Sequence, residues 1–144
     1  MKRLVKFWRL PAAERRLLVS ALAYLAAYRI GLWVLPLPGL LRRAQTWQVS
    51  ETCQVLTEPE RIAWALRVAG RYLPGGRNCL AQALAGRALL ARRGCPAQLR
   101  IGVAAAAGER FRAHAWVEHE GRILIGAAGA AGYTPLPPLE GRRP

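Results

Sequence analysis

The hydrophobic positions of this chain follow a helical repeat at first and an alternating repeat in its last third. One helix is predicted to begin after Pro11 and to continue through an apolar run that starts at Leu17. Pro36 and Pro38 end that helix, because proline removes a backbone donor and crowds the preceding turn. Residues 36–58 have no clean repeat and predict a connector with one short helix.

Two more helices are predicted, each with clear end signals. The first covers residues 58–72 and stops at a Pro-Gly-Gly sequence. The second runs from Cys79 to Arg92, capped by Asn78 or the preceding loop, and ends where cations and a glycine follow one another. Gly86 inside this helix indicates close packing, because glycine costs about 1 kcal/mol there relative to alanine.

After residue 95 the repeat becomes that of β-strands, which are predicted over residues 97–107, 111–118 and 122–127. In the middle strand His114 and Trp116 share one face. A three-residue turn at His119–Gly121 would place His114 opposite Gly126. Helices followed by a small antiparallel sheet predict an α+β domain.

We divide the chain into three regions on this basis. Residues 1–58 are an N-terminal helical and connector region, and residues 59–130 are the core of the domain. Residues 131–144 form a tail rich in proline and glycine that we expect to be weakly ordered.

The charge is strongly positive, with 22 Lys and Arg against 8 Asp and Glu and a formal net charge of +14. Such a charge attracts nucleic acid, an anionic membrane surface or an acidic peptide, although a coding bias toward arginine explains it equally well. The five Trp, four Tyr and two Phe are not interleaved with the arginines in a binding motif. We therefore expect no nucleic-acid partner.

The apolar N-terminal helix is a poor candidate for a membrane span. Its uncharged part extends only from Leu17 to Tyr28, whereas a span needs about 20 apolar residues. Arg29 would cost about 2.5–3.5 kcal/mol at the centre of a span. This favours a buried or surface-docked helix. Peripheral membrane contact stays open, because a basic flank with Trp and Tyr suits an interface.

Cysteine usage points to thiol chemistry rather than to a metal site. Cys53, Cys79 and Cys95 are an odd number without regular spacing, and the chain has only two histidines. No metal site of ordinary spacing, no cofactor and no disulfide framework is expected. We interpret Cys53 and Cys95 as incidental or packing residues and expect a cytoplasmic protein with at least one reduced thiol.

Cys79 and His114 are the candidate catalytic residues. A helix N-terminus lowers the pKa of a thiol by offering unpaired N–H groups and a positive dipole end, and Cys79 opens a predicted helix. If the strand face that carries His114 meets this helix, the imidazole can take the thiol proton. The backbone N–H of Cys79 would then suit a developing oxyanion.

The segments CLAQALAGRALLARRG, LRIGV and FRAHAWVEHEGRILIG resemble the transglutaminase-like leader peptidase of lasso-peptide biosynthesis over about 50 residues. The resemblance implies a papain-like cysteine-protease core with Cys79 as nucleophile and His114 as base. It implies removal of the leader from a ribosomally made precursor peptide before a separate lasso cyclase acts on the core peptide.

Two departures from that family matter. The family commonly has an aspartate on the returning strand, where this chain has Gly126, and Glu118 lies about 13 Å from His114 along the strand. A backbone carbonyl, a water or a residue of the tail could orient the imidazole instead. Residues 1–58 do not resemble the family's small leader-recognition domain, so a separate leader-binding protein is expected to deliver the substrate.

Three alternatives stay open. The chain could be a non-catalytic scaffold, a pseudoenzyme of the same biosynthetic complex. It could be a basic nucleic-acid-binding module, suggested by charge alone. It could also transfer the acyl group to an amine rather than to water.

Overall fold

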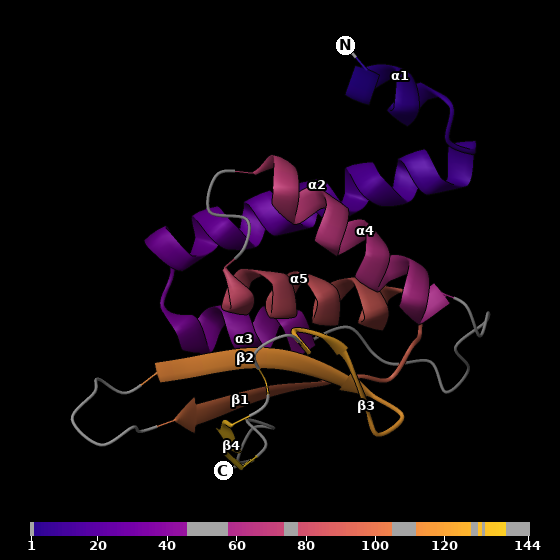
Figure 1. Cartoon of the computed structure of the whole chain (residues 1–144). Helices are drawn as coiled ribbons and strands as arrows, with labels where there is room; N and C mark the ends of the chain where they lie inside the picture. Colours follow the sequence, from indigo (N-terminus) through magenta and orange to yellow (C-terminus); the bar gives the residue numbers. More distant parts are fainter. Residues whose placement is uncertain are drawn as a thin grey trace.

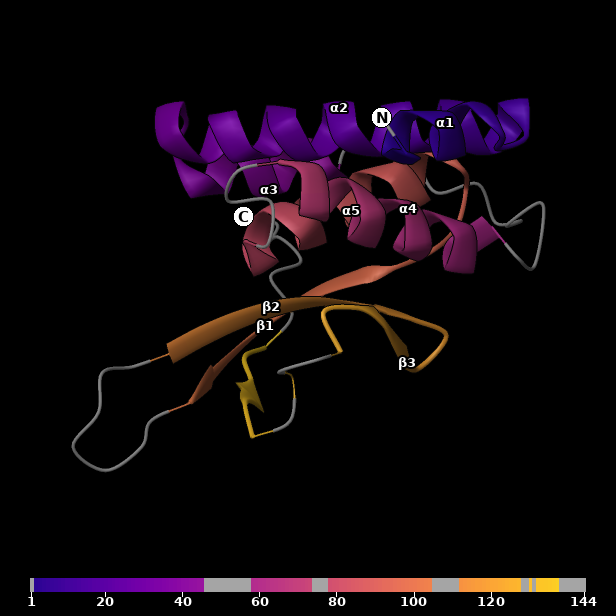
Figure 2. The ribbon, with the colours of Figure 1, turned by 45° about the horizontal axis from the view of Figure 1, so that its top comes forward.

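Within the part of the chain that is described, five helices lie over a sheet of four strands (Figure 1). This computed structural model of the 144-residue chain describes residues 2–45, 58–73, 78–104, 112–127, 130 and 132–137. A tilted view places the helices on one side of the sheet (Figure 2). The predicted α+β class is confirmed.

The N-terminal helices are α1 (Lys2–Trp8), α2 (Ala12–Val34) and α3 (Leu37–Gln45). Pro11 occupies the N-cap of α2, so the predicted helix start is confirmed. α2 ends two residues before Pro36, and α3 is the short helix predicted for the connector. The rest of that connector, residues 46–57, lies outside the described residues.

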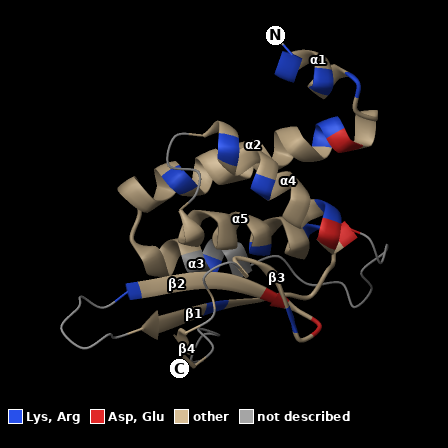
Figure 3. Cartoon of the chain, in the orientation of Figure 1, with Lys and Arg blue, Asp and Glu red and all other residues tan. Residues whose placement is uncertain are grey.

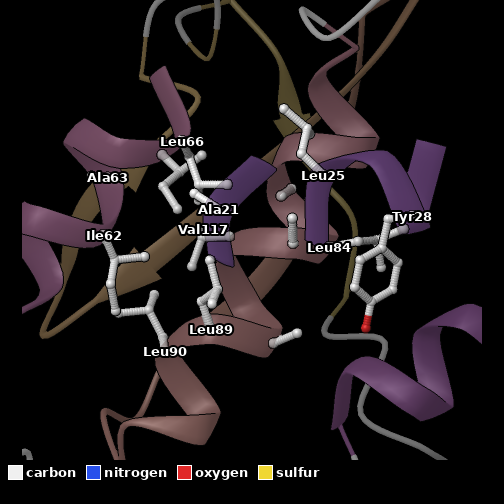
Figure 4. Close-up of a cluster of buried hydrophobic side chains, with 14 of the residues drawn as sticks. Ala21, Leu25, Tyr28, Ile62, Ala63, Leu66, Leu84, Leu89, Leu90 and Val117 are labelled. Carbon is white, nitrogen blue, oxygen red and sulfur yellow. The ribbon is translucent and has the colours of Figure 1, made fainter. Parts of the chain in front are cut away.

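One face of α2 forms part of the core. Leu17, Ala21 and Leu25 are buried against α4 (Glu58–Tyr72) and α5 (Cys79–Arg92), two helices whose bounds agree with the prediction. Figure 4 shows side chains of α2, α4 and α5 meeting Val117 in one cluster. The apolar N-terminal helix is therefore packed on the domain along one side.

Close packing at Gly86 of α5 is also confirmed. A Cβ at this position would lie 2.2 Å from Cδ1 of Ile125 and 3.2 Å from Cδ1 of Leu66. Glycine lets α5 approach both β3 and α4, at the cost of its low helix propensity. This approach fixes the height of α5 above the sheet.

A buried carboxylate ties the start of α4 to the end of α5. Glu58 is 8% exposed and pairs with Arg93 just after α5, and it also pairs with Arg61 at 3.5 Å. The carboxylate lies in the first turn of α4, where the helix dipole favours negative charge. The pair holds together two helices that carry the core.

The sheet has the order β3-β2-β1-β4, and every neighbouring pair is antiparallel. Its strands are β1 (Gln98–Ala104), β2 (Arg112–His119), β3 (Arg122–Ile125) and β4 (Thr134–Pro135). The first three were predicted with small differences at their ends. β4 pairs with β1 and was not predicted, because it comes from the segment expected to be weakly ordered.

The predicted turn between β2 and β3 is wrong by one residue. His119 pairs with Arg122, so the turn is Glu120–Gly121, and both residues have positive φ, 49° and 75°. Positive φ at both central residues matches the twist of a two-residue hairpin. A bulge between Val117 and Glu118 then shifts the register, so the predicted backbone pairing of His114 with residue 126 does not form.

The cysteines differ in part from expectation. Cys95 is buried in the core, as expected of a packing residue, but it is also bonded in a disulfide, which was not predicted. Cys53 lies outside the described residues. Cys79 is a free thiol, as predicted, and its residue is half-buried.

Candidate active site

Cys79 lies at the first position of α5. The side chain of Asn78 caps this helix by accepting hydrogen bonds from the N–H groups of Leu80 (3.0 Å) and Ala81 (3.2 Å). The N–H of Gln82 donates to the carbonyl of Asn78. Among the described residues these bonds leave the N–H of Cys79 as the free donor of the first turn, next to its own thiol.

His114 in β2 has a fixed tautomer. Its Nε2 lies 2.8 Å from the carbonyl oxygen of Gly126. Because a carbonyl oxygen only accepts hydrogen bonds, Nε2 must carry the proton and donate it. The neutral ring then has Nδ1 as its one proton acceptor, which is the state a general base requires.

The orienting group of His114 is therefore a backbone carbonyl, one of the three substitutes that the sequence left open. The residue that supplies it, Gly126, was singled out from the sequence for a different reason, a strand pairing that does not occur. Gly126 follows β3 and has a φ of +84°. This left-handed conformation turns its carbonyl toward the imidazole rather than along the sheet ladder.

A carboxylate cannot simply replace this carbonyl at residue 126. A Cβ there would lie 2.9 Å from the carbonyl oxygen of Ala115 and 3.1 Å from Cβ of Trp116. The Ala115 contact is with backbone, which cannot rotate away. Gly126 is thus fixed both by its φ and by the space around it.

Two aromatic rings hold the imidazole from its sides. Trp116 stacks at 6.1 Å between ring centroids with 24° between the planes, and Tyr133 lies at 5.5 Å and 41°. Gly102 makes room for both, since a Cβ on it would lie 2.7 Å from the Trp116 ring and 3.0 Å from Cβ of Tyr133. These contacts restrict rotation of His114 about its side-chain bonds.

Glu118 supports this arrangement without touching His114. Its carboxylate accepts a hydrogen bond of 2.9 Å from Nε1 of Trp116 and lies 3.8 Å from Nε of Arg100. The hydrogen bond fixes the plane of the Trp116 indole, which in turn stacks on the imidazole. Glu118 therefore positions the histidine through a ring.

The structure places Cys79 and His114 at one end of the molecule but on different sides of β2. α5 and β2 begin at the same end in both views (Figures 1 and 2), and the two elements pack together. α5 lies on the face of Ala115 and Val117, which belong to the core, whereas His114 and Trp116 are on the opposite face. The expected meeting of the histidine face with the helix is not found.

Among the described residues no hydrogen bond joins the thiol of Cys79 to His114. In enzymes without substrate, catalytic hydrogen bonds are often long and shorten only when substrate is bound.

The second histidine has a structural role. His119 is buried, and its Nδ1 donates to the carbonyl of Pro96 at 2.5 Å, which ties the end of β2 to the entrance of β1. Within the described ranges no group of three or more His, Cys, Asp or Glu side chains could hold a metal ion.

Sequence reasoning missed Tyr133, because nothing in a glycine-rich segment indicates that it returns to the sheet. Trp116 was recognised as a neighbour of His114 on the same strand face, but its ring contact could not be read from the alternation. Gly102 gave no signal of its own in the predicted strand over residues 97–107.

The model of the transglutaminase-like superfamily matches residues 21–137, from the middle of α2 to just beyond β4. No match was found among curated proteins or among solved structures. Since the matched segment covers most of the chain and contains both Cys79 and His114, the protein belongs to the transglutaminase-like superfamily.

Proposed function

We propose that the protein is a cysteine peptidase that removes the leader from a ribosomally synthesised lasso-peptide precursor. Folds of this superfamily are generally like those of cysteine peptidases. The substrate class is inferred from sequence resemblance: the helix that begins at Cys79 and the strand that contains His114 resemble the leader peptidase of lasso-peptide biosynthesis. In this proposal Cys79 is the nucleophile and His114 is the base.

The reaction follows from the groups on the two residues. His114 Nδ1 takes the proton of the Cys79 thiol, and Sγ attacks the carbonyl carbon of the scissile peptide bond. The N–H of Cys79, which has no partner among the described residues, donates to the oxyanion of the tetrahedral intermediate. The imidazolium then gives its proton to the leaving amine, which leaves a thioester on Cys79 that water hydrolyses with His114 as base.

The observation that carries the proposal is the bond between His114 Nε2 and the carbonyl of Gly126. It fixes the tautomer that a base needs and takes the orienting role that an aspartate commonly has in the related family. A carbonyl stabilises the imidazolium less than a carboxylate does, because it carries no full charge. We therefore expect a slower enzyme than one with a complete triad.

Substrate delivery would depend on other proteins. We propose that a separate leader-binding protein presents the precursor and that a lasso cyclase uses the released core peptide. The formal charge of +14 suits an acidic leader or an acidic surface on the leader-binding protein.

A second candidate is a non-catalytic scaffold in the same complex. Two observations favour it. His114 and α5 lie on opposite faces of β2, and among the described residues no hydrogen bond joins Cys79 to His114. In this alternative the protein would hold precursor and cyclase together without cleaving a bond.

Cleavage of the precursor separates the two candidates. The precursor peptide is incubated with the leader-binding protein and with the wild-type chain, Cys79→Ala or His114→Ala, and the products are identified by mass spectrometry. Leader release by the wild type alone supports the peptidase, and a product with the core joined to an amine would identify acyl transfer. Leader release that persists in Cys79→Ala, or an intact precursor in every reaction, would overturn the proposal.

A further inference from the structure

The face of α2 that points away from the core is apolar along its length. Val19, Ile30, Trp33 and Val34 are 56%, 64%, 80% and 75% exposed, and they lie opposite the core-facing side chains of the same helix. α2 is the one helix of the described residues that is long and apolar enough to cross a membrane. A surface helix of a soluble protein usually has polar side chains on its outer face, so this apolar face indicates an interaction with an apolar partner.

Positive charge gathers at the beginning of this face. Figure 3 shows basic residues on α1 and at the start of α2. The cations are Lys2, Arg3, Lys6, Arg9, Arg15 and Arg16, and Glu14 is the one acidic residue of this N-terminal segment. An acidic or anionic partner therefore fits this end.

A tryptophan lies near each end of the apolar face, and each is paired with an arginine. The guanidinium of Arg15 lies 5.4 Å from the ring centroid of Trp8, and that of Arg29 lies 5.8 Å from that of Trp33. Trp8 is 69% exposed. Tryptophan and arginine are suited to the headgroup region of a bilayer, where an amphipathic ring meets both apolar and charged groups.

We propose that α1 and the outer face of α2 bind the surface of an anionic lipid bilayer, with α2 lying in the plane of the interface. The apolar residues enter the boundary between headgroups and acyl chains, and the cations contact lipid phosphates. α2 does not span the bilayer in this arrangement, because Leu17, Ala21 and Leu25 stay packed in the core. A second copy of this chain is a poor occupant, since its charge of +14 repels the same charge.

Flotation with lipid vesicles tests the proposal on the full-length protein. Vesicles of phosphatidylcholine and phosphatidylglycerol in equal parts are compared with vesicles of phosphatidylcholine alone. The protein is expected to float with the anionic vesicles and to dissociate as salt is raised. The double variant Ile30→Ser/Trp33→Ser should bind at least about tenfold more weakly, because it removes two of the most exposed apolar groups.

Tyr72→Ser is the matched control, since it removes a 57% exposed aromatic ring from α4, outside this face. Its binding should equal that of the wild type, and circular dichroism should show all three proteins folded. Failure of the folded wild type to bind anionic vesicles would overturn the proposal. Equal binding by Ile30→Ser/Trp33→Ser would overturn it too. So would self-association of the wild-type protein without vesicles, if Ile30→Ser/Trp33→Ser abolished that self-association.

Discussion

Replacing Gly126 with alanine tests the geometry that orients His114. The glycine has a φ of +84°, a region that costs other residues about 1–2 kcal/mol. The added Cβ would also lie 2.9 Å from the carbonyl oxygen of Ala115, inside normal contact distance. Since this neighbour is backbone, we expect a further cost of about 1–3 kcal/mol from crowding.

Gly121→Ala supplies the matched control. Gly121 has a φ of +75°, but a Cβ there would meet nothing within 4 Å, so only the conformational cost applies. Urea unfolding should therefore show Gly126→Ala to be less stable than Gly121→Ala by about 1–3 kcal/mol, at equal dependence of the free energy on urea concentration. Equal stability of the two variants would refute the crowding that we derive for residue 126.

The same substitution should lower catalysis. Any shift that relieves the contact with Ala115 moves the carbonyl of Gly126 from His114 Nε2, and one hydrogen bond contributes about 1 kcal/mol net. In folded protein we expect precursor cleavage to fall about fivefold. Gly126→Asp should not restore a triad, because its side chain starts from the same crowded Cβ; faster cleavage by this variant would contradict us.

Three further substitutions test the contacts that hold the fold together, each by urea unfolding. Asn78→Ala should cost about 1 kcal/mol by removing the cap of α5, and Asn78→Ser should recover part of it; no loss would show the cap to be unimportant. Gly86→Ala should be destabilising. Ile125→Val should cost less stability in the Gly86→Ala background than in the wild type, because it deletes the Cδ1 atom that the new methyl group meets. Strictly additive costs of the two substitutions would contradict this contact. Glu58→Ala should cost about 1–2 kcal/mol by leaving Arg93 without its partner, and a change within error would show that the pair is only a surface contact.

The elements that were predicted well are those whose signals are local. α4 and α5 were placed at their observed bounds, because acidic residues and a capping Asn78 mark their starts and glycine or cations mark their ends. Close packing at Gly86 was also predictable, since a glycine inside an apolar helix weakens the helix and a close neighbouring element is a common reason for its presence.

The features that were missed depend on contacts between distant segments. β4 and Tyr133 come from a stretch without a hydrophobic repeat, and only the neighbouring β1 gives that stretch a place. The turn after His119 was wrong by one residue because strand alternation does not reveal a bulge. The carbonyl of Gly126 could be suggested as an orienting group but not located, since a backbone group leaves no mark in the sequence.

Alkylation of Cys79 by iodoacetamide tests most directly whether Cys79 and His114 act as one pair. The rate is measured at neutral pH by mass spectrometry of the peptide that contains Cys79, in folded wild type and in His114→Ala, with His114→Gln as a second folded variant. We predict that the thiol reacts roughly tenfold or more slowly in both variants, because the reactive species is the thiolate that His114 Nδ1 generates. Equal rates in all three proteins would contradict the pair and favour the non-catalytic scaffold.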